Sequence, residues 1–201
     1  LFPSLAHHQN MKELNFIATS FFKLDEYCGK RNRFIGDCRQ FIPMVSYWIL
    51  VVKDHKLMDR VIPAGEVLKD RVKNKFWSLN SRARNVNKIK NGDRVIFYVT
   101  GRNERGFKGC GIVAGEPHPL TPEQRFHIIG MPSEAFDYAI DFSEAEVWDK
   151  LVTLEEVKDK MPLLKGKNLS KPPFRGSIVK ITEQDYNAIL EYKKSSQAPI
   201  Q

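Results

Sequence analysis

The fold is decided by a stretch that begins Phe76-Trp77-Ser78-Leu79-Asn80 and continues through a basic segment into Asn91-Gly92-Asp93-Arg94 and Val95-Ile96-Phe97-Tyr98-Val99. Asn91 and Gly92 tolerate positive φ angles and favour a turn. The five residues that end the stretch are β-branched or aromatic, which is typical of a strand. Trp77 therefore precedes a strand and does not lie in a helical pattern. An aromatic ring beside small polar groups in this position can form a pocket for a flat, partly polar ligand such as a nucleobase.

Basic residues surround Trp77 on both sides, with only Asp70 and Asp93 nearby to oppose them; they are Arg71, Lys73, Lys75, Arg82, Arg84, Lys88 and Lys90. An aromatic flanked by cations suits a nucleic acid, because bases stack on aromatic rings and phosphates attract cations. Read alone, Trp77 is equally well a core residue, and the basic run is better explained as a solvated face. The two together favour nucleic-acid binding.

Composition supports a globular domain with an excess of positive charge. Of 201 residues, 42% are hydrophobic and 28% are charged, enough to form a core. The 32 lysines and arginines exceed the 24 acidic residues, which leaves a net charge of +8 and favours polyanionic partners. No internal repeat is present.

The sequence predicts a cytoplasmic protein without a membrane span, cofactor or metal. The best apolar run, Met44–Val52, is far shorter than the roughly 20 residues that cross a bilayer. The first residues have neither a charged region nor a long apolar region, so no signal peptide is expected. Cys28, Cys38 and Cys110 fit neither a disulfide framework nor a zinc motif, which favours a reducing compartment.

A domain boundary is predicted near Pro43. The preceding residues, 1–43, form an appendage of unassigned role that is partly helical, with an amphipathic helix expected within Met11–Tyr27. The main domain is expected to span residues 44–196, followed by a tail at 197–201.

The main domain reads mostly as strands. Tyr47–Val52 is a short apolar run typical of a buried strand, and Arg94–Thr100 is expected to pair with Phe107–Pro117. Glycines in that partner predict a bulge or tight bend of the kind that a small barrel needs. Another strand is predicted over residues 136–142, with residues 143–148 as a possible extension. Capping-box spacing predicts helices that begin after Thr153 and Thr182.

These features resemble the EVE domain in their order along the chain: Tyr47-Trp48-Ile49, Trp77-Ser78 before a basic loop, Asn91-Gly92-Asp93-Arg94, Gly111-Ile112-Val113 and a closing Thr182-Glu183-Gln184-Asp185-Tyr186 helix. The resemblance covers about residues 44–194. EVE domains belong to the PUA-like superfamily and are related to YTH readers of N6-methyladenine. The resemblance implies an α+β fold, a small mixed β-barrel with flanking helices.

The resemblance also implies a pocket that holds one modified base flipped out of a nucleic-acid strand. Trp77 and Ser78 look like the Trp-Ser pair that forms one wall of the pocket. The second wall is expected from Phe126, with Phe136 or Tyr138 as alternatives. Residues after the first strand are expected to read the base edge; relatives often use an amide there, whereas this chain offers Asp54, His55 and Asp59.

Cations near this pocket are expected to hold the nucleic-acid backbone; they are Lys75, Arg82, Arg84, Lys88 and Arg175. Surface positions remain an alternative for Asp54, His55 and Asp59, and Arg175 could instead cover the end of the barrel.

The functional prediction is a non-catalytic reader of N6-methyladenine or a modified cytosine in DNA or RNA. One alternative is an RNA-binding PUA-like module that acts on tRNA or rRNA. Another is a small hydrolase or transferase that uses Cys110 and His118, although Cys110 lies between glycines in a strand, where a small buried residue is the simpler interpretation. Relatives occur alone or as the N-terminal reader of McrB-type restriction systems, which implies a fused or associated nuclease or motor as a partner.

Overall fold

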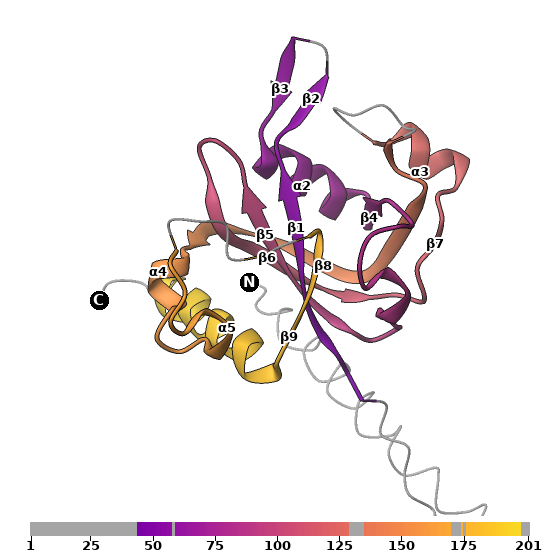
Figure 1. Ribbon diagram of the computed structural model, residues 1–201. Helices are drawn as coiled ribbons and strands as arrows, with labels where there is room; N and C mark the ends of the chain where they lie inside the picture. The colour runs from indigo at the N-terminus through magenta and orange to yellow at the C-terminus, as the bar shows by residue number, and fades with distance from the viewer. Residues whose placement is uncertain (1–43, 58, 129–134, 170–173, 175, 198–201) are drawn as a thin grey trace, which may run out of the picture. The chain divides into compact units, whose positions relative to one another are not determined.

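A strongly curved mixed sheet organises the chain in the computed structural model, which describes residues 44–57, 59–128, 135–169, 174 and 176–197 (Figure 1). The strands follow the order β4 (Phe76–Leu79), β8 (Tyr138–Val152), β6 (Arg105–Val113), β5 (Arg94–Thr100), β1 (Tyr47–Lys53) and β9 (Ile178–Ile181). The short strand β7 (His118–Pro119) also pairs with β8. β1 and β5 are parallel, and the other neighbouring strands are antiparallel. This is the expected α+β, PUA-like architecture.

The sheet bends where its pairing register shifts. One shift separates Phe97 from Tyr98 in β5, and β6 has two further shifts against β8. Glycines permit the close approach of these strands: a Cβ atom on Gly109 would collide with the backbone oxygen of Glu146. The prediction of a bulged, glycine-dependent second strand is confirmed, although β6 ends at Val113 and not at Pro117.

The turn before β5 is held by one buried carboxylate. Asp93 accepts hydrogen bonds from the indole Nε1 of Trp48 at 2.7 Å, from the backbone nitrogen of Ser46 at 2.9 Å and from that of Lys90 at 3.0 Å. Gly92 has a φ of +83°, as the turn prediction requires. The Asn91–Arg94 segment therefore joins the start of β5 to the start of its parallel neighbour β1.

The helices begin where local capping favours them. Thr153 forms a capping box with Glu156 at the start of α4 (Leu154–Val157). The hydroxyl of Thr182 accepts from the backbone nitrogen of Asp185 at 3.1 Å, at the start of α5 (Glu183–Gln197). Both predicted helix starts are confirmed. A third capping box, of Thr121 with Gln124, begins α3 (Pro122–Phe126).

Several features differ from the sequence prediction. β8 includes the possible extension at 143–148 but continues beyond it to Val152, and Trp77 lies inside β4 and not merely upstream of a strand. All four residues of β4 are buried, so the segment lacks the alternation that identifies a half-buried strand. The helix α2 (Ala64–Lys73) and the hairpin of β2 (His55–Leu57) with β3 (Arg60–Ile62) were not predicted.

Two apolar clusters lie on the two faces of the sheet. On β1, Trp48, Leu50 and Val52 belong to the cluster that α2 covers, whereas Ile49 packs into a second cluster with α4 and α5. The alternation follows from the period of two in a strand. Figure 1 shows α2 next to β1, and α5 following β9 with α4 beside it. The predicted appendage at 1–43, its helix and the end of the tail lie outside the described residues.

Candidate functional site

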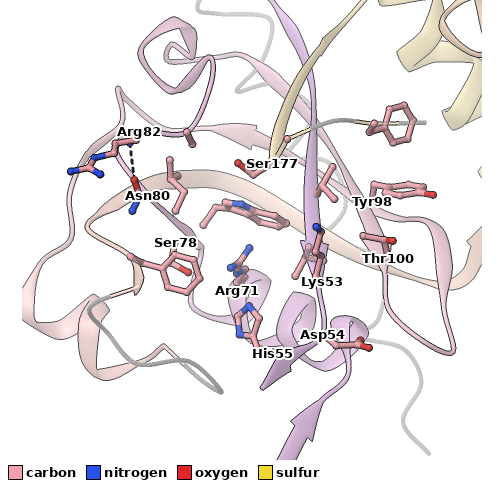
Figure 2. Close-up of a pocket in the computed structure, with 18 residues that line it drawn as sticks. Lys53, Asp54, His55, Arg71, Ser78, Asn80, Arg82, Tyr98, Thr100 and Ser177 are labelled. Carbon is pink, nitrogen blue, oxygen red and sulfur yellow. Dashed lines mark hydrogen bonds between the residues drawn. The ribbon is translucent and has the colours of Figure 1, made fainter. Parts of the chain in front are cut away.

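A cavity of about 850 Å³ opens on the α2 side of the sheet (Figure 2). Its walls come from the end of β1, from α2, from β4 with the loop after it, and from the segment that precedes β9. Residues that line it include Lys53, Arg71, Trp77, Ser78, Phe136 and Ser177, and we call it the Trp77 cavity. Its volume is in the range typical of small-molecule pockets.

The indole of Trp77 packs against Phe97 of β5 in the sheet. Its ring stacks on Phe97 with centroids 5.2 Å apart and planes within 9° of parallel. Phe97 in turn sits against glycines of β6: a Cβ on Gly109 would lie 2.9 Å from Phe97 Cδ2, and one on Gly111 would lie 3.2 Å from Cζ. The glycines therefore make room for Phe97, and Phe97 supports Trp77.

The guanidinium of Arg71 covers the indole. Arg71 Cζ lies 4.3 Å from the centroid of the Trp77 ring and 5.7 Å from that of Phe136. Only 6% of Arg71 and 1% of Trp77 are exposed. The predicted wall residue Trp77 thus lines the cavity, but Phe97 and Arg71 cover its ring, so a ligand would meet the guanidinium of Arg71 before the face of the indole.

Arg71 has no charge partner in the described part of the chain. None of the described residues forms a hydrogen bond or an ion pair with its side chain. Burial lowers the pKa of Arg71 to about 9, an effect that the neighbouring Asp70 only partly opposes, so the group stays protonated at neutral pH. In Figure 2 its side chain lies in the middle of the labelled lining residues.

Arg71 was not among the predicted site residues, but its position carried a signal. The buried residues of α2 include Ala64, Val67, Leu68 and Arg71, which is the i, i+3, i+4, i+7 pattern of a core-facing helix stripe. The last position of this stripe holds an arginine in place of an apolar residue. Recognition of α2 in the sequence would therefore have identified a buried cation next to Trp77.

The carboxylate of Asp54 lines the Trp77 cavity and also organises its frame. Its Oδ1 accepts from the backbone nitrogen of Ala64 at 2.8 Å, and its Oδ2 accepts from that of Arg102 at 2.9 Å. These bonds tie the first residue of α2 and the loop after β5 to the end of β1. His55, also a lining residue, is 7% exposed, and its ring centroid lies 5.9 Å from that of Phe136.

The loop after β4 is hydrogen-bonded to Asp137, the residue that precedes β8. Ser81 donates its backbone N–H to Asp137 Oδ1 at 2.6 Å, and hydrogen bonds from Ser81 hold the pKa of the Asp137 carboxyl below its usual value. The next residue, Arg82, is exposed and lines the cavity, with its backbone nitrogen donating to Asn80 Oδ1 at 2.9 Å. This loop therefore presents a cation at the edge of the cavity.

The structure brings together Trp77, Ser78, Asp54, His55 and Arg82 of the predicted set. Phe126 is instead 88% exposed on α3 and does not line the cavity; the alternative Phe136 does. The long connection between β6 and β8 offered no register in the sequence, which is why the aromatic could not be assigned from it.

Other predicted residues lie outside the Trp77 cavity. Asp59 is exposed in the turn between β2 and β3, and Tyr138 packs against the cluster that α2 covers. The cations Lys75, Arg84 and Lys88 are exposed and do not line the cavity. Arg175 lies outside the described residues, although its neighbours Phe174 and Gly176 line the cavity.

Cys110 and His118 bond to different partners. The thiol of Cys110 lies 3.3 Å from Glu146 Oε1, and burial together with this carboxylate raises its pKa to about 12. His118 contacts Asp141 Oδ2 at 2.9 Å through Nε2. Desolvation lowers the pKa of His118, but its hydrogen bonds to Pro119 and Asp141 outweigh this effect and raise it. A protonated thiol held apart from a histidine lacks the features of an activated nucleophile.

The described residues contain no group of three or more His, Cys, Asp or Glu side chains that could hold a metal ion. Among the described helices, none has the length and apolar character needed to cross a membrane.

The fold and the cavity define a PUA-like module. The chain belongs to the EVE domain family, whose model matches residues 46–192. Among solved structures, it is similar to a hypothetical protein from Leishmania major, with 20% identity, a TM-score of 0.52, and coverage of 76% of this chain and 97% of that one.

Two human structures are also similar. The DUF55 domain of human thymocyte nuclear protein 1 has 19% identity, a TM-score of 0.51, and coverage of 74% of this chain and 99% of that one. Human THYN1 in complex with DNA that contains 5-methylcytosine has 20% identity, a TM-score of 0.50, and coverage of 74% and 98% respectively. No curated protein matches the chain.

Proposed function

We propose that this chain is a non-catalytic nucleic-acid-binding module that takes one modified base, flipped out of a DNA strand, into the Trp77 cavity. The observation that carries the proposal is the buried, unpaired guanidinium of Arg71 over the ring of Trp77. A cavity that combines an aromatic ring with a hydrogen-bond donor is suited to a planar ligand with polar edges, which describes a base.

The free-energy cost of extracting a base is similar in size to the stabilisation that the cavity can provide. Extraction of a base from a duplex costs a few kcal/mol, and stacking on an accessible aromatic ring recovers roughly 1–3 kcal/mol per base. The half-buried ring of Phe136 can supply this contact, since Phe97 and Arg71 cover Trp77. Hydrogen bonds to the base edge supply the remainder. A methyl group on the base needs no hydrogen-bond partner, and apolar lining residues such as Leu79 and Ala83 suit it.

Charge around the cavity supports a polyanionic strand. Lys53 and Arg82 are exposed lining residues, and the chain has a net charge of +8. Cations at the mouth would contact phosphates on either side of the extracted base and give an affinity that falls with salt. The complex of human THYN1 with DNA containing 5-methylcytosine supports DNA as the polymer. Association with a nuclease or motor is a further part of the proposal.

Fluorescence anisotropy tests the proposal, with matched DNA and RNA oligonucleotides that are unmodified or carry 5-methylcytosine or N6-methyladenine. Two variants separate the cavity from the surface. Ser177→Trp fills the cavity from its lining, whereas Ser195→Trp places the same side chain at an exposed position on α5. Thermal melts confirm that both variants fold.

We expect one modified DNA to bind about tenfold or more tightly than its unmodified counterpart, with the preference lost in Ser177→Trp and kept in Ser195→Trp. A preference seen only with RNA would favour the alternative of an RNA-binding PUA-like module. Binding that ignores modification, or that Ser177→Trp leaves unchanged, would contradict the proposal.

A further inference from the structure

The guanidinium of Arg71 restricts which base the Trp77 cavity can hold. A guanidinium has N–H donors and no acceptor, and it stays charged at neutral pH. No described side chain offers it a carboxylate or another acceptor. A buried charge without a partner is costly, so a ligand that supplies acceptors gains the interaction that the protein itself leaves unmade.

The nearest acidic residue does not fill this role. Asp70 precedes Arg71 in α2, and residues adjacent in a helix do not face each other. Its carboxylate instead accepts from the side-chain amide of Asn74 at 3.1 Å, and burial raises its pKa. Asp54 is also occupied, since both of its oxygens accept backbone N–H groups. The acceptors for Arg71 must therefore come from outside these two carboxylates.

The frame around Arg71 keeps its planar head in one place. The ring of Trp77 lies 4.3 Å from its Cζ, and Phe136 lies 5.7 Å away. The first residue of α2 is tied to β1 through Asp54. A planar fork that is already oriented binds two neighbouring acceptors side by side at little further entropic cost.

Only some bases present two neighbouring acceptors. Cytosine does so with N3 and O2, and guanine with O6 and N7. Adenine places its amino donor beside both N1 and N7, and thymine places the N3–H donor between its two carbonyls. In cytosine, C5 lies on the opposite side of the ring from N3 and O2, so a 5-methyl group would point away from the guanidinium.

We propose that Arg71 is a specificity-determining residue of the Trp77 cavity and selects a flipped base with two adjacent acceptors, cytosine or guanine, over adenine and thymine. This inference rests on the proposed function. It assigns the choice of base to the α2 residue over Trp77, whereas the cations at the mouth bind the strand without regard to sequence.

The test measures the affinity for one DNA duplex in which a single mispaired position carries cytosine, 5-methylcytosine, guanine, adenine, N6-methyladenine or thymine. Mispairing lowers the cost of extraction for every base. The variants are Arg71→Gln, whose amide pairs with adenine through one donor and one acceptor, and Arg71→Lys, which keeps the charge but loses the fork. Arg82→Gln is the matched control at the cavity mouth.

We expect the wild-type chain to bind the duplex with cytosine or guanine at the mispaired position about tenfold or more tightly than the duplex with adenine or thymine. The duplex that binds tightest identifies the base that supplies the acceptors. Arg71→Gln should move the preference toward adenine, and Arg71→Lys should reduce it, which keeps the test valid if the glutamine variant does not fold. Arg82→Gln should weaken the binding of all duplexes equally and lower the salt dependence.

A wild-type preference for adenine or thymine, or a preference that both Arg71 variants leave unchanged, would overturn the role of Arg71 while leaving the cavity as a base site. Binding that is the same for all bases in the wild-type chain would overturn the proposed function itself, and with it the inference.

Discussion

All three tryptophans of this protein are buried, and a cation lies over the ring of each. The cations over Trp77 and Trp148 belong to a cavity and to a surface cluster respectively, and of these two only the one over Trp148 is neutralised. Lys193 Nζ lies 5.6 Å from the ring centroid of Trp148 and forms an ion pair with Glu146 at 2.8 Å. The same carboxylate accepts from Trp148 Nε1 at 2.7 Å. Arg71 lies closer to Trp77, at 4.3 Å, but lacks such a carboxylate among the described residues.

The two regions differ in whether their charged groups neutralise one another within the protein. Hydrogen bonds from Lys193, Trp148 and Cys110 lower the pKa of Glu146, so this surface cluster satisfies its own charges. The Trp77 cavity presents a largely buried cation, without a carboxylate partner among the described residues, to an open space of about 850 Å³. The first arrangement joins α5 to β8, whereas the second leaves an interaction for a ligand to complete.

Truncation of the two tryptophans should show whether both rings carry the fold. Trp77→Ala should lower the free energy of unfolding by about 3–5 kcal/mol, because the ring is 1% exposed and stacks on Phe97. Trp148→Ala, at 2% exposure, serves as the control and should cost a similar amount without altering DNA binding. Urea denaturation measures both. A loss below about 1 kcal/mol for Trp77→Ala would contradict the supporting role of the ring.

Thiol labelling tests whether Cys110, which bonds to Glu146 in the cluster around Trp148, stays protonated and unreactive in the native chain. Cys110 should react with a disulfide reagent at pH 8 at least about a hundredfold more slowly in the native chain than in the denatured chain, because its raised pKa keeps it protonated. Cys28 and Cys38 are replaced by serine so that a single thiol is followed. Glu146→Gln should accelerate the reaction, since this carboxylate raises the pKa. Rapid native labelling would instead revive the hypothesis of a catalytic thiol.

Replacement of each cation by methionine sharpens the comparison further. Arg71→Met should raise the free energy of unfolding by about 1–3 kcal/mol, because it removes a buried charge without a partner. Lys193→Met should lower it by about 0–1 kcal/mol, as expected for loss of a partly exposed ion pair. Thermal or urea denaturation of both variants gives the two signs. A loss of stability in Arg71→Met would indicate that the arginine is retained for the fold and not for a ligand.

Local sequence patterns were enough to predict much of the sheet. The apolar run at Tyr47, the turn at Asn91-Gly92 and the two Thr caps at 153 and 182 all lie where expected, since each depends on residues within a few positions. Trp77 and Ser78, which the resemblance to the EVE domain assigns to a base pocket, both line the Trp77 cavity, and their contact with a base stays a prediction.

Other parts of the site could not be predicted from local sequence patterns. The stripe of α2 is interrupted by a buried arginine, which a hydrophobic pattern does not count, and the helix was missed. The aromatic contribution was assigned to Phe126, which is exposed, whereas Phe136 lines the cavity. The carboxylate of Asp54 appeared suited to a base edge, but it accepts hydrogen bonds from backbone nitrogens on both sides.

The sequence by itself determined the strands β1, β5, β6 and β8, the caps at Thr153 and Thr182 and the excess of positive charge, because these follow from neighbouring residues and from composition. Only the tertiary structure decided that glycines of β6 make room for Phe97, that Phe97 supports Trp77, and that Arg71 covers the indole with no carboxylate beside it. These contacts join residues that lie far apart in the chain. Burial and charge pairing are properties of that assembled environment, and no local pattern encodes them.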